Sequence, residues 1–138
     1  MSYIRYKNNN LFVENVSVKG LTSKYQSPFY LYSNSNIVEN YRSFYNNFKK
    51  INPLVCFSVK ANSNIQILKI LKKIGSGADV VSGGELLKAL KSGIKPNKIV
   101  FSGVGKTEEE IRLAIRNNIL LINVESENEA ILINKIAG

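Results

Sequence analysis

The chain has 138 residues, of which 44% are hydrophobic, so it can bury the core of one domain and is not disordered by composition. Its formal net charge is +9, from 19 Lys and Arg against 10 Asp and Glu, and such an excess attracts polyanions. The lysines stand singly or in pairs and form no run of five or more. We therefore expect solvated helix faces and no nucleic-acid partner.

The cysteine content and the first ten residues bear on the compartment. Cys56 is the single cysteine, so no disulfide can form within the chain. The opening MSYIRYKNNN lacks the apolar segment of a signal peptide, and no stretch reaches the roughly 18 apolar residues of a membrane span. We expect a cytoplasmic protein without a membrane partner.

The N-terminal segment, residues 1–27, combines turn-forming asparagines with short apolar pieces. Asn8, Asn9 and Asn10 separate two such pieces, and Val16, Val18 and Leu21 continue an extended pattern. This arrangement predicts a β-hairpin or an edge strand.

From Pro28 onward the hydrophobic period changes repeatedly from two residues to 3.6, which is typical of βα units. The predicted strands cover residues 29–32, 54–59, 78–82, 99–102 and 119–124. The helix after the first strand carries Ile37, Tyr41, Phe44 and Phe48 on one stripe, and later helices are predicted at 64–74, closed by Gly75 and Gly77, and at 85–91. Two more helices begin at capping boxes, Thr107 with Glu110 and Ser126 with Glu129.

Five strands alternating with five helices predict an α/β fold with a parallel sheet. A doubly wound sheet and a (β/α)8 barrel both fit this pattern. A barrel typically needs about 250 residues. If the fold is a barrel, the 138 residues therefore form an incomplete one.

In either architecture, ligands gather at the carboxyl ends of the parallel strands. Lys60 follows the second strand at even steps from Cys56 and Ser58, which predicts that all three share a face. Partial burial would favour the neutral, nucleophilic amine of Lys60. On spacing alone, however, a lysine that simply reaches water is the simpler interpretation.

The next strand ends contribute further polar candidates. Asp79 can pair with a cationic amine, and Glu85 lies near the start of a helix, where a carboxylate is favoured. Both residues equally suit structural roles, on neighbouring backbone groups or in a first helical turn. Ser82 and Ser102 follow the third and fourth strands.

Two other site types are disfavoured. The run Gly103-Val104-Gly105-Lys106-Thr107 resembles a P-loop, but Val100 stands where that motif needs its first glycine. We attribute the run to a turn followed by a helix cap. The chain has no histidine and one cysteine, so the common His/Cys metal sites and Ser-His or Cys-His catalytic arrangements are excluded within it.

Four strings, in order, resemble the diaminopimelate decarboxylases of the fold-type III family of pyridoxal-phosphate (PLP) enzymes. They are Ser27-Pro28-Phe29-Tyr30-Leu31-Tyr32, Phe57-Ser58-Val59-Lys60-Ala61-Asn62, Asp79-Val80-Val81-Ser82-Gly83-Gly84-Glu85 and Phe101-Ser102-Gly103-Val104-Gly105-Lys106-Thr107. The last two resemble the diaminopimelate branch more than the ornithine branch. The resemblance covers essentially the whole chain.

The resemblance implies an incomplete (β/α)8 barrel of about five βα units over residues 28–138. Residues 1–27 would precede the barrel and pack with a C-terminal β-domain outside the chain. Lys60 would be the catalytic lysine that holds PLP, with Asp79 and Glu85 orienting it, and Ser82 and Ser102 as further cofactor contacts. The substrate would be meso-diaminopimelate, decarboxylated to lysine in lysine biosynthesis by a homodimeric enzyme.

The family's cofactor-stacking histidine, phosphate loop and substrate-binding residues have no counterpart in the chain, so we expect it to be inactive alone. Two alternatives stay open. One is a PLP-binding module related to alanine racemase, without decarboxylase activity. The other is a non-enzymatic basic binding protein.

Overall fold

The computed structural model describes residues 3–138; Met1 and Ser2, the first residues of the expected 1–27 segment, lie outside them. Two compact units are present, residues 1–47 and residues 48–138. The expected division into an N-terminal segment 1–27 and a barrel part 28–138 stays a prediction. Of the helices described, none combines the length and apolar character that a membrane span requires.

The N-terminal unit contains the predicted hairpin. Strands β1 (Ile4–Lys7) and β2 (Asn10–Val13) pair antiparallel around Asn8 and Asn9, which adopt positive φ angles of 50° and 59°. Asparagine tolerates this left-handed conformation better than most residues, so the turn suits its sequence. The hairpin prediction is confirmed, and β3 (Val16–Ser17) extends the sheet.

The extended pattern predicted beyond Ser17 is wrong. Helix α1 (Val18–Thr22) begins there, because the Ser17 hydroxyl accepts a hydrogen bond from the backbone N–H of Gly20 and caps the helix. Residues 29–32, predicted as the first barrel strand, are also not a strand in the described chain. No described strand pairs with them, and Tyr30 is 90% exposed. A strand needs a partner for its backbone groups, so the apolar pattern alone is insufficient here.

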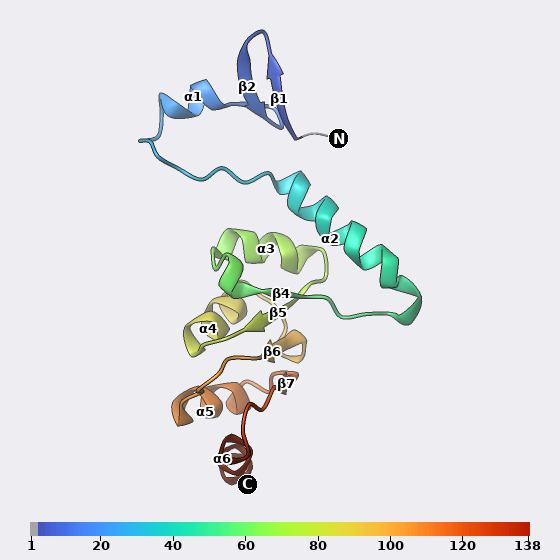
Figure 1. Cartoon of the computed structure of the whole chain (residues 1–138), viewed down its shortest axis with the longest axis vertical. Helices are drawn as coiled ribbons and strands as arrows, with labels where there is room; N and C mark the ends of the chain where they lie inside the picture. Colours follow the sequence, from blue (N-terminus) through green and yellow to red (C-terminus); the bar gives the residue numbers. More distant parts are fainter. Residues whose placement is uncertain (1–2) are drawn as a thin grey trace. The chain divides into compact units, whose positions relative to one another are not determined.

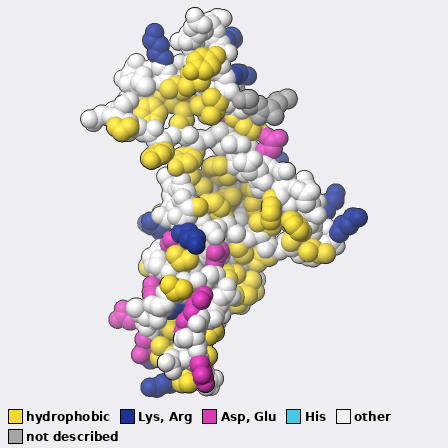
Figure 2. All heavy atoms as spheres, in the orientation of Figure 1, with side chains coloured by type: hydrophobic (Ala, Val, Ile, Leu, Met, Phe, Trp, Pro, Cys, Tyr) yellow, Lys and Arg dark blue, Asp and Glu magenta, His cyan; other side chains and the backbone are white. Residues whose placement is uncertain are grey.

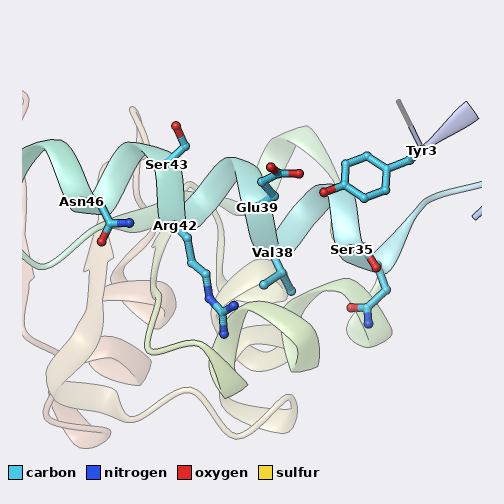
Figure 3. Close-up of a pocket in the computed structure, with 8 residues that line it drawn as sticks. Tyr3, Ser35, Val38, Glu39, Arg42, Ser43 and Asn46 are labelled. Atoms are coloured by element: carbon cyan, nitrogen blue, oxygen red, sulfur yellow. The ribbon is translucent and has the colours of Figure 1, made fainter. Parts of the chain in front are cut away.

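Helix α2 (Asn34–Phe48) is confirmed, and its start is fixed from the hairpin. The Glu14 carboxylate accepts hydrogen bonds from the Ser33 hydroxyl at 2.5 Å and from the backbone N–H of Ser35 at 2.8 Å. These bonds lower the pKa of Glu14. Figure 3 shows a polar hollow beside α2, toward which Tyr3 extends from the hairpin.

The second unit holds the parallel sheet (Figure 1). Its strands lie in the order of the chain, β4-β5-β6-β7, and every neighbouring pair is parallel. In chain order the elements are η1 (Lys49–Ile51), β4 (Cys56–Ser58), η2 (Val59–Ala61), α3 (Ile65–Lys73), β5 (Gly77–Val80), α4 (Gly83–Lys91), η3 (Pro96–Lys98), β6 (Ile99–Phe101), α5 (Glu108–Arg116), β7 (Leu121–Ile122) and α6 (Glu127–Ala137).

One face of this sheet forms the core with the helices. Ala78, Val80, Ile99 and Phe101 point to that face and are completely buried. They pack with buried residues of the helices and of η2, namely Val59, Leu68, Leu86, Ala89 and Ala114. Asp79 alternates to the opposite face, since successive strand residues point to opposite sides.

The βα repeat is confirmed as an open parallel sheet, as expected for an incomplete barrel. The described residues contain four parallel strands instead of the five predicted, because residues 29–32 remain unpaired. The predicted helix 64–74 is confirmed as α3, and Gly75 follows it with a φ of 94°. Gly77, predicted as part of the same cap, instead begins β5, where its missing side chain admits the Lys98 carbonyl oxygen.

Glu110 connects two neighbouring helices at their N-termini. Its carboxylate accepts hydrogen bonds from the backbone N–H of Thr107, which completes the predicted capping box of α5, and from the N–H of Gly83 in the first turn of α4 at 2.7 Å. Both bonds favour the charged form, and they lower the pKa of Glu110. One ionised side chain thus fixes α4 and α5 together.

We predict that the contribution of Glu110 to stability depends on pH. A carboxyl with a lowered pKa stabilises the folded state fully above its unfolded pKa, near the ordinary value of 4.5, and progressively less as the pH falls through its lowered value. Glu110→Gln should lose about 1 kcal/mol of unfolding free energy at neutral pH, the usual scale of a lost cap. Urea unfolding at pH 7 and below pH 4.5 measures the difference, which should shrink at the lower pH.

Glu109→Gln is the matched control, because Glu109 lies exposed in the same helical turn. Equal losses for the two variants at neutral pH would contradict a special role for Glu110.

Candidate functional site

The carboxyl ends of the four parallel strands bring the polar candidates to one edge of the sheet. The register pairs Ser58 with Asp79 and Val80 with Phe101. The ladder continues past the strand ends, since the N–H of Ser102 donates to the Val80 carbonyl at 2.8 Å and the N–H of Asn123 donates to the Phe101 carbonyl at 2.9 Å. Residues more than 40 positions apart therefore lie at the same edge.

Asp79 is the central acid of this edge. Its Oδ2 accepts a hydrogen bond from the Ser58 hydroxyl at 3.0 Å, across the β4–β5 pair. Its Oδ1 is buried and lacks a hydrogen-bond partner among the described residues. A buried oxygen without a partner costs free energy, about 1–3 kcal/mol for a typical group, and so marks a place where a cationic or N–H group would bind.

Cys56 lies two residues before Ser58 and faces the same side of the sheet. Burial, and to a smaller extent the nearby Asp79 carboxylate, raise the pKa of the Cys56 thiol. The thiol therefore stays protonated at neutral pH and behaves as a small apolar group. This residue contributes packing and no nucleophile.

The even spacing of Lys60 from Cys56 and Ser58 predicts that it continues the face of strand β4, and this prediction is wrong. The strand ends at Ser58, and Val59 to Ala61 form the 3-10 turn η2, in which Val59 is buried and Lys60 is exposed. Lys60 is exposed, as the simpler interpretation of the spacing predicted, and is not partly buried, because the turn places the apolar Val59 in the core and directs its neighbour outward. The turn itself lies against β5 and α4, so Lys60 still belongs to the strand-end edge.

Ser82 and Glu85 bond to the backbone of the turn between β5 and α4. The Ser82 hydroxyl accepts a hydrogen bond from the N–H of Glu85 at 3.3 Å and caps α4. The Glu85 carboxylate accepts from the N–H of Val81 at 2.9 Å. Both side chains shape the turn that follows Asp79, which is the structural alternative that the sequence left open for Glu85.

Ser102 has a partner that the sequence did not indicate. Its hydroxyl oxygen accepts a hydrogen bond from the side-chain amide of Asn123 at 2.9 Å, which links the ends of β6 and β7. The polar residue after an apolar strand was the only available signal for Asn123. The sequence predicts that Lys106 lies in a turn, whereas the structure also buries its side chain completely against Glu129.

The strands can approach closely at this edge because of Gly103. A Cβ atom on this residue would lie 2.3 Å from the carbonyl oxygen of Val81, a distance that a Cβ atom could not adopt without a backbone shift. Glycine is therefore required where the chain leaves β6 beside the end of β5. The glycine at this position therefore serves the packing of two strand ends.

The arrangement presents an accessible amine at Lys60, a carboxylate with one unpaired oxygen at Asp79, and hydroxyls at Ser58, Ser82 and Ser102. An amine beside a carboxylate can condense with a carbonyl group, because the carboxylate stabilises the cationic nitrogen that forms. Residues 3–138 contain no group of three or more His, Cys, Asp or Glu placed to hold a metal ion. The hollow beside α2 contains none of the five candidate site residues.

The chain matches a known family model, proteins of known name and solved structures. Residues 34–138 match the family model described as pyridoxal-dependent decarboxylase, pyridoxal binding domain. Diaminopimelate decarboxylase from Aquifex aeolicus is 45% identical over 136 residues, and the one from Helicobacter pylori strain J99 is 50% identical over 117 residues. The crystal structure of diaminopimelate decarboxylase from M. jannaschii in complex with L-lysine aligns with a TM-score of 0.93 at 39% identity.

These matches cover nearly the whole chain but only part of each relative. The Aquifex match spans 99% of the chain and 32% of that protein, and the Helicobacter match spans 85% and 29%. The M. jannaschii alignment spans 96% of the chain and 32% of that structure. The chain therefore spans about a third of the length of the relatives that it matches.

We predict that Gly103→Ala destabilises the fold through the strand-end edge. Overpacking of this kind costs about 1–3 kcal/mol, because the backbone must move. Gly84→Ala is the control, since a Cβ there would meet only the Ser82 hydroxyl at an ordinary 3.9 Å. Chemical unfolding measures both variants, and a Gly103→Ala variant as stable as Gly84→Ala would contradict the close contact with Val81.

Proposed function

The chain belongs to the family of pyridoxal-dependent decarboxylases, over their pyridoxal-binding domain, and on that premise we propose that it forms the lysine-bearing part of the PLP site of a diaminopimelate decarboxylase. The activity proposed is the conversion of meso-diaminopimelate to L-lysine and carbon dioxide. The observation that carries the proposal is the position of Lys60 in the turn η2, which follows β4 and contacts β5, the strand that carries the half-paired Asp79.

The residues present fit the cofactor. PLP carries an aldehyde, and Lys60 offers an exposed amine that can reach it. The unpaired Oδ1 of Asp79 is an acceptor for a cationic nitrogen, and the hydrogen bond from Ser58 fixes the orientation of this carboxylate. When bound, PLP withdraws electrons from the α-carbon of an amino acid and so makes the loss of carbon dioxide possible.

The other candidate residues then have supporting roles. Glu85 and Ser82 hold the turn after β5 and so keep Asp79 in place. Ser102, bonded to Asn123, closes the edge at β6 and is a further candidate contact to the cofactor. These roles rest on the hydrogen bonds of the turn and of the strand ends.

The choice of substrate rests on the relatives. Those named above are diaminopimelate decarboxylases, and L-lysine, the expected product, is present in the M. jannaschii complex. The exposed outer apolar residues, such as Leu121 at 43%, are consistent with a sheet that other barrel strands would extend.

We predict that PLP reacts selectively at Lys60. The purified 138-residue chain is incubated with a small excess of PLP and treated with sodium borohydride, which reduces a lysine–PLP linkage to a stable secondary amine. Peptide mass spectrometry then locates the modified lysine. Residue 60 should dominate in the wild type and in Lys69→Arg, a control at an exposed lysine of α3, and Lys60→Arg should lose the selective product.

Modification spread evenly over the surface lysines of the wild-type chain would contradict the assignment of Lys60. Asp79→Asn in the same experiment reports on the carboxylate. It should weaken the selectivity, because the amide cannot balance a positive charge on the nitrogen of Lys60.

We predict that the 138-residue chain alone releases no carbon dioxide from meso-diaminopimelate. The chain has no histidine to stack on the cofactor, and the open sheet leaves Lys60 in contact with water. Chromatographic measurement of L-lysine, with and without PLP, tests this expectation. Lysine formation that requires both PLP and Lys60 would show that these residues suffice for the reaction.

A further inference from the structure

Lys106 is a buried cation to which the proposed reaction assigns no role. Its side chain is completely buried, and its ammonium group lies 2.5 Å from Oε1 of Glu129, whose side chain is 9% exposed. The same ammonium donates to the backbone carbonyl of Asn123 at 2.7 Å and lies 5.7 Å from the centre of the Phe101 ring. Removing one member of a buried pair is strongly destabilising, because it leaves the charge of the other without compensation.

The contacts of Lys106 lead to the strand-end edge in two steps. Lys106 holds Asn123 through the backbone carbonyl, and the side-chain amide of Asn123 donates to the Ser102 hydroxyl at 2.9 Å. Asn123 is otherwise exposed, at the end of a strand of only two residues. The backbone of Asn123 is held by two hydrogen bonds, from its own N–H to the Phe101 carbonyl and from the Lys106 ammonium to its carbonyl. The ammonium group therefore restrains the backbone from which this side chain projects.

Glu129 is committed to Lys106 and not to its own helix cap. The sequence predicts that Ser126 and Glu129 form a reciprocal capping box, but only the Ser126 half forms, with its hydroxyl accepting from the N–H of Glu129. The Glu129 carboxylate instead accepts from Lys106 and, at 3.4 Å, from the N–H of Glu125. The carboxylate therefore joins the loop before α5 to the loop before α6.

We propose that Lys106, held by Glu129, is a positioning residue that sets Asn123 and Ser102 at the strand-end edge and thereby tunes the reaction of Lys60 with PLP. The part that concerns Lys60 rests on the proposed function, whereas the part that concerns Asn123 does not. The contacts of Lys106 are with Asn123, Glu129 and Phe101, so it acts through Asn123 and not as a catalytic residue. A purely structural pair would hold α5 and α6 together and leave the strand ends unchanged.

The first measurement needs no cofactor. The side-chain amide resonances of Asn123 are followed by NMR, with Asn123→Asp as the assignment variant. They should shift in Lys106→Met and, by less, in Glu129→Gln, because both weaken the restraint on the Asn123 carbonyl. They should stay in place in Leu71→Ala, a core variant in the last turns of α3, next to the opposite, amino end of β5.

The double variant Lys106→Met with Glu129→Leu separates the two roles, because apolar replacement of a buried ion pair commonly restores stability. We expect recovered stability together with a still shifted Asn123 amide. The borohydride experiment should then show a selectivity for Lys60 lowered by about 2- to 30-fold, the range for couplings carried through contacting side chains. Amounts are compared at equal fractions of folded protein.

An Asn123 amide that stays in place in Lys106→Met and in Glu129→Gln would overturn the positioning role. Full recovery of both the amide position and the Lys60 selectivity in the double variant would do the same. If wild-type PLP labelling is unselective, the proposed function fails, while the NMR comparison still decides the role of Lys106.

Discussion

The parallel register of β5 between β4 and β6 is the constraint on which the strand-end site depends. Because the strands are parallel and each is followed by a helix, the residues next in the chain emerge at one edge. Ser58 faces Asp79 across one pair, and Ser102 continues the ladder across the other. The register needs two close approaches, at Gly77 and Gly103, where a side chain would collide with a neighbouring backbone.

Carboxylates at helix starts connect successive βα units to this edge. Glu110 joins the start of α5 to that of α4, and Glu129 joins the start of α6 to the loop before α5 through Lys106. Each is a first-turn acid of its own helix, where the helix dipole favours a negative charge. Acidic side chains accordingly gather over α5 and α6 in Figure 2, and the net positive charge arises elsewhere, as on the last turns of α3 and α4. Much of the charge distribution therefore follows from the helix ends, with acidic residues in first turns and lysines in last turns.

The fold was predictable wherever a pattern of side chains determines local structure. Hydrophobic periodicity gave α2 and α3, and the spacing of Thr107 and Glu110 gave the cap of α5. The strand predicted at residues 29–32 is wrong because a strand depends on a partner that no local pattern reveals. The place of Lys60 after an apolar run made it a candidate, but no local pattern predicts the turn η2, because the choice between a continued strand and this turn is made by the burial of Val59. The Lys106–Glu129 pair was not predicted, because its partners lie 23 residues apart in the sequence.

The unpaired oxygen of Asp79 is the feature that packing alone does not explain. Ala78 and Val80 on either side are buried among apolar residues, and an apolar residue at 79 would serve the open face of the sheet equally well. Ser58 satisfies only one of the two carboxylate oxygens, so the acid keeps the cost of the other. Unpaired buried polar groups in native proteins call for a specific explanation, and local violations of this kind are expected at functional sites. The proposed function supplies a cationic nitrogen on Lys60, in the turn η2 that contacts the same strand. It thereby connects Asp79 Oδ1, the buried side-chain oxygen left without a partner among the described residues, to the lysine of that turn.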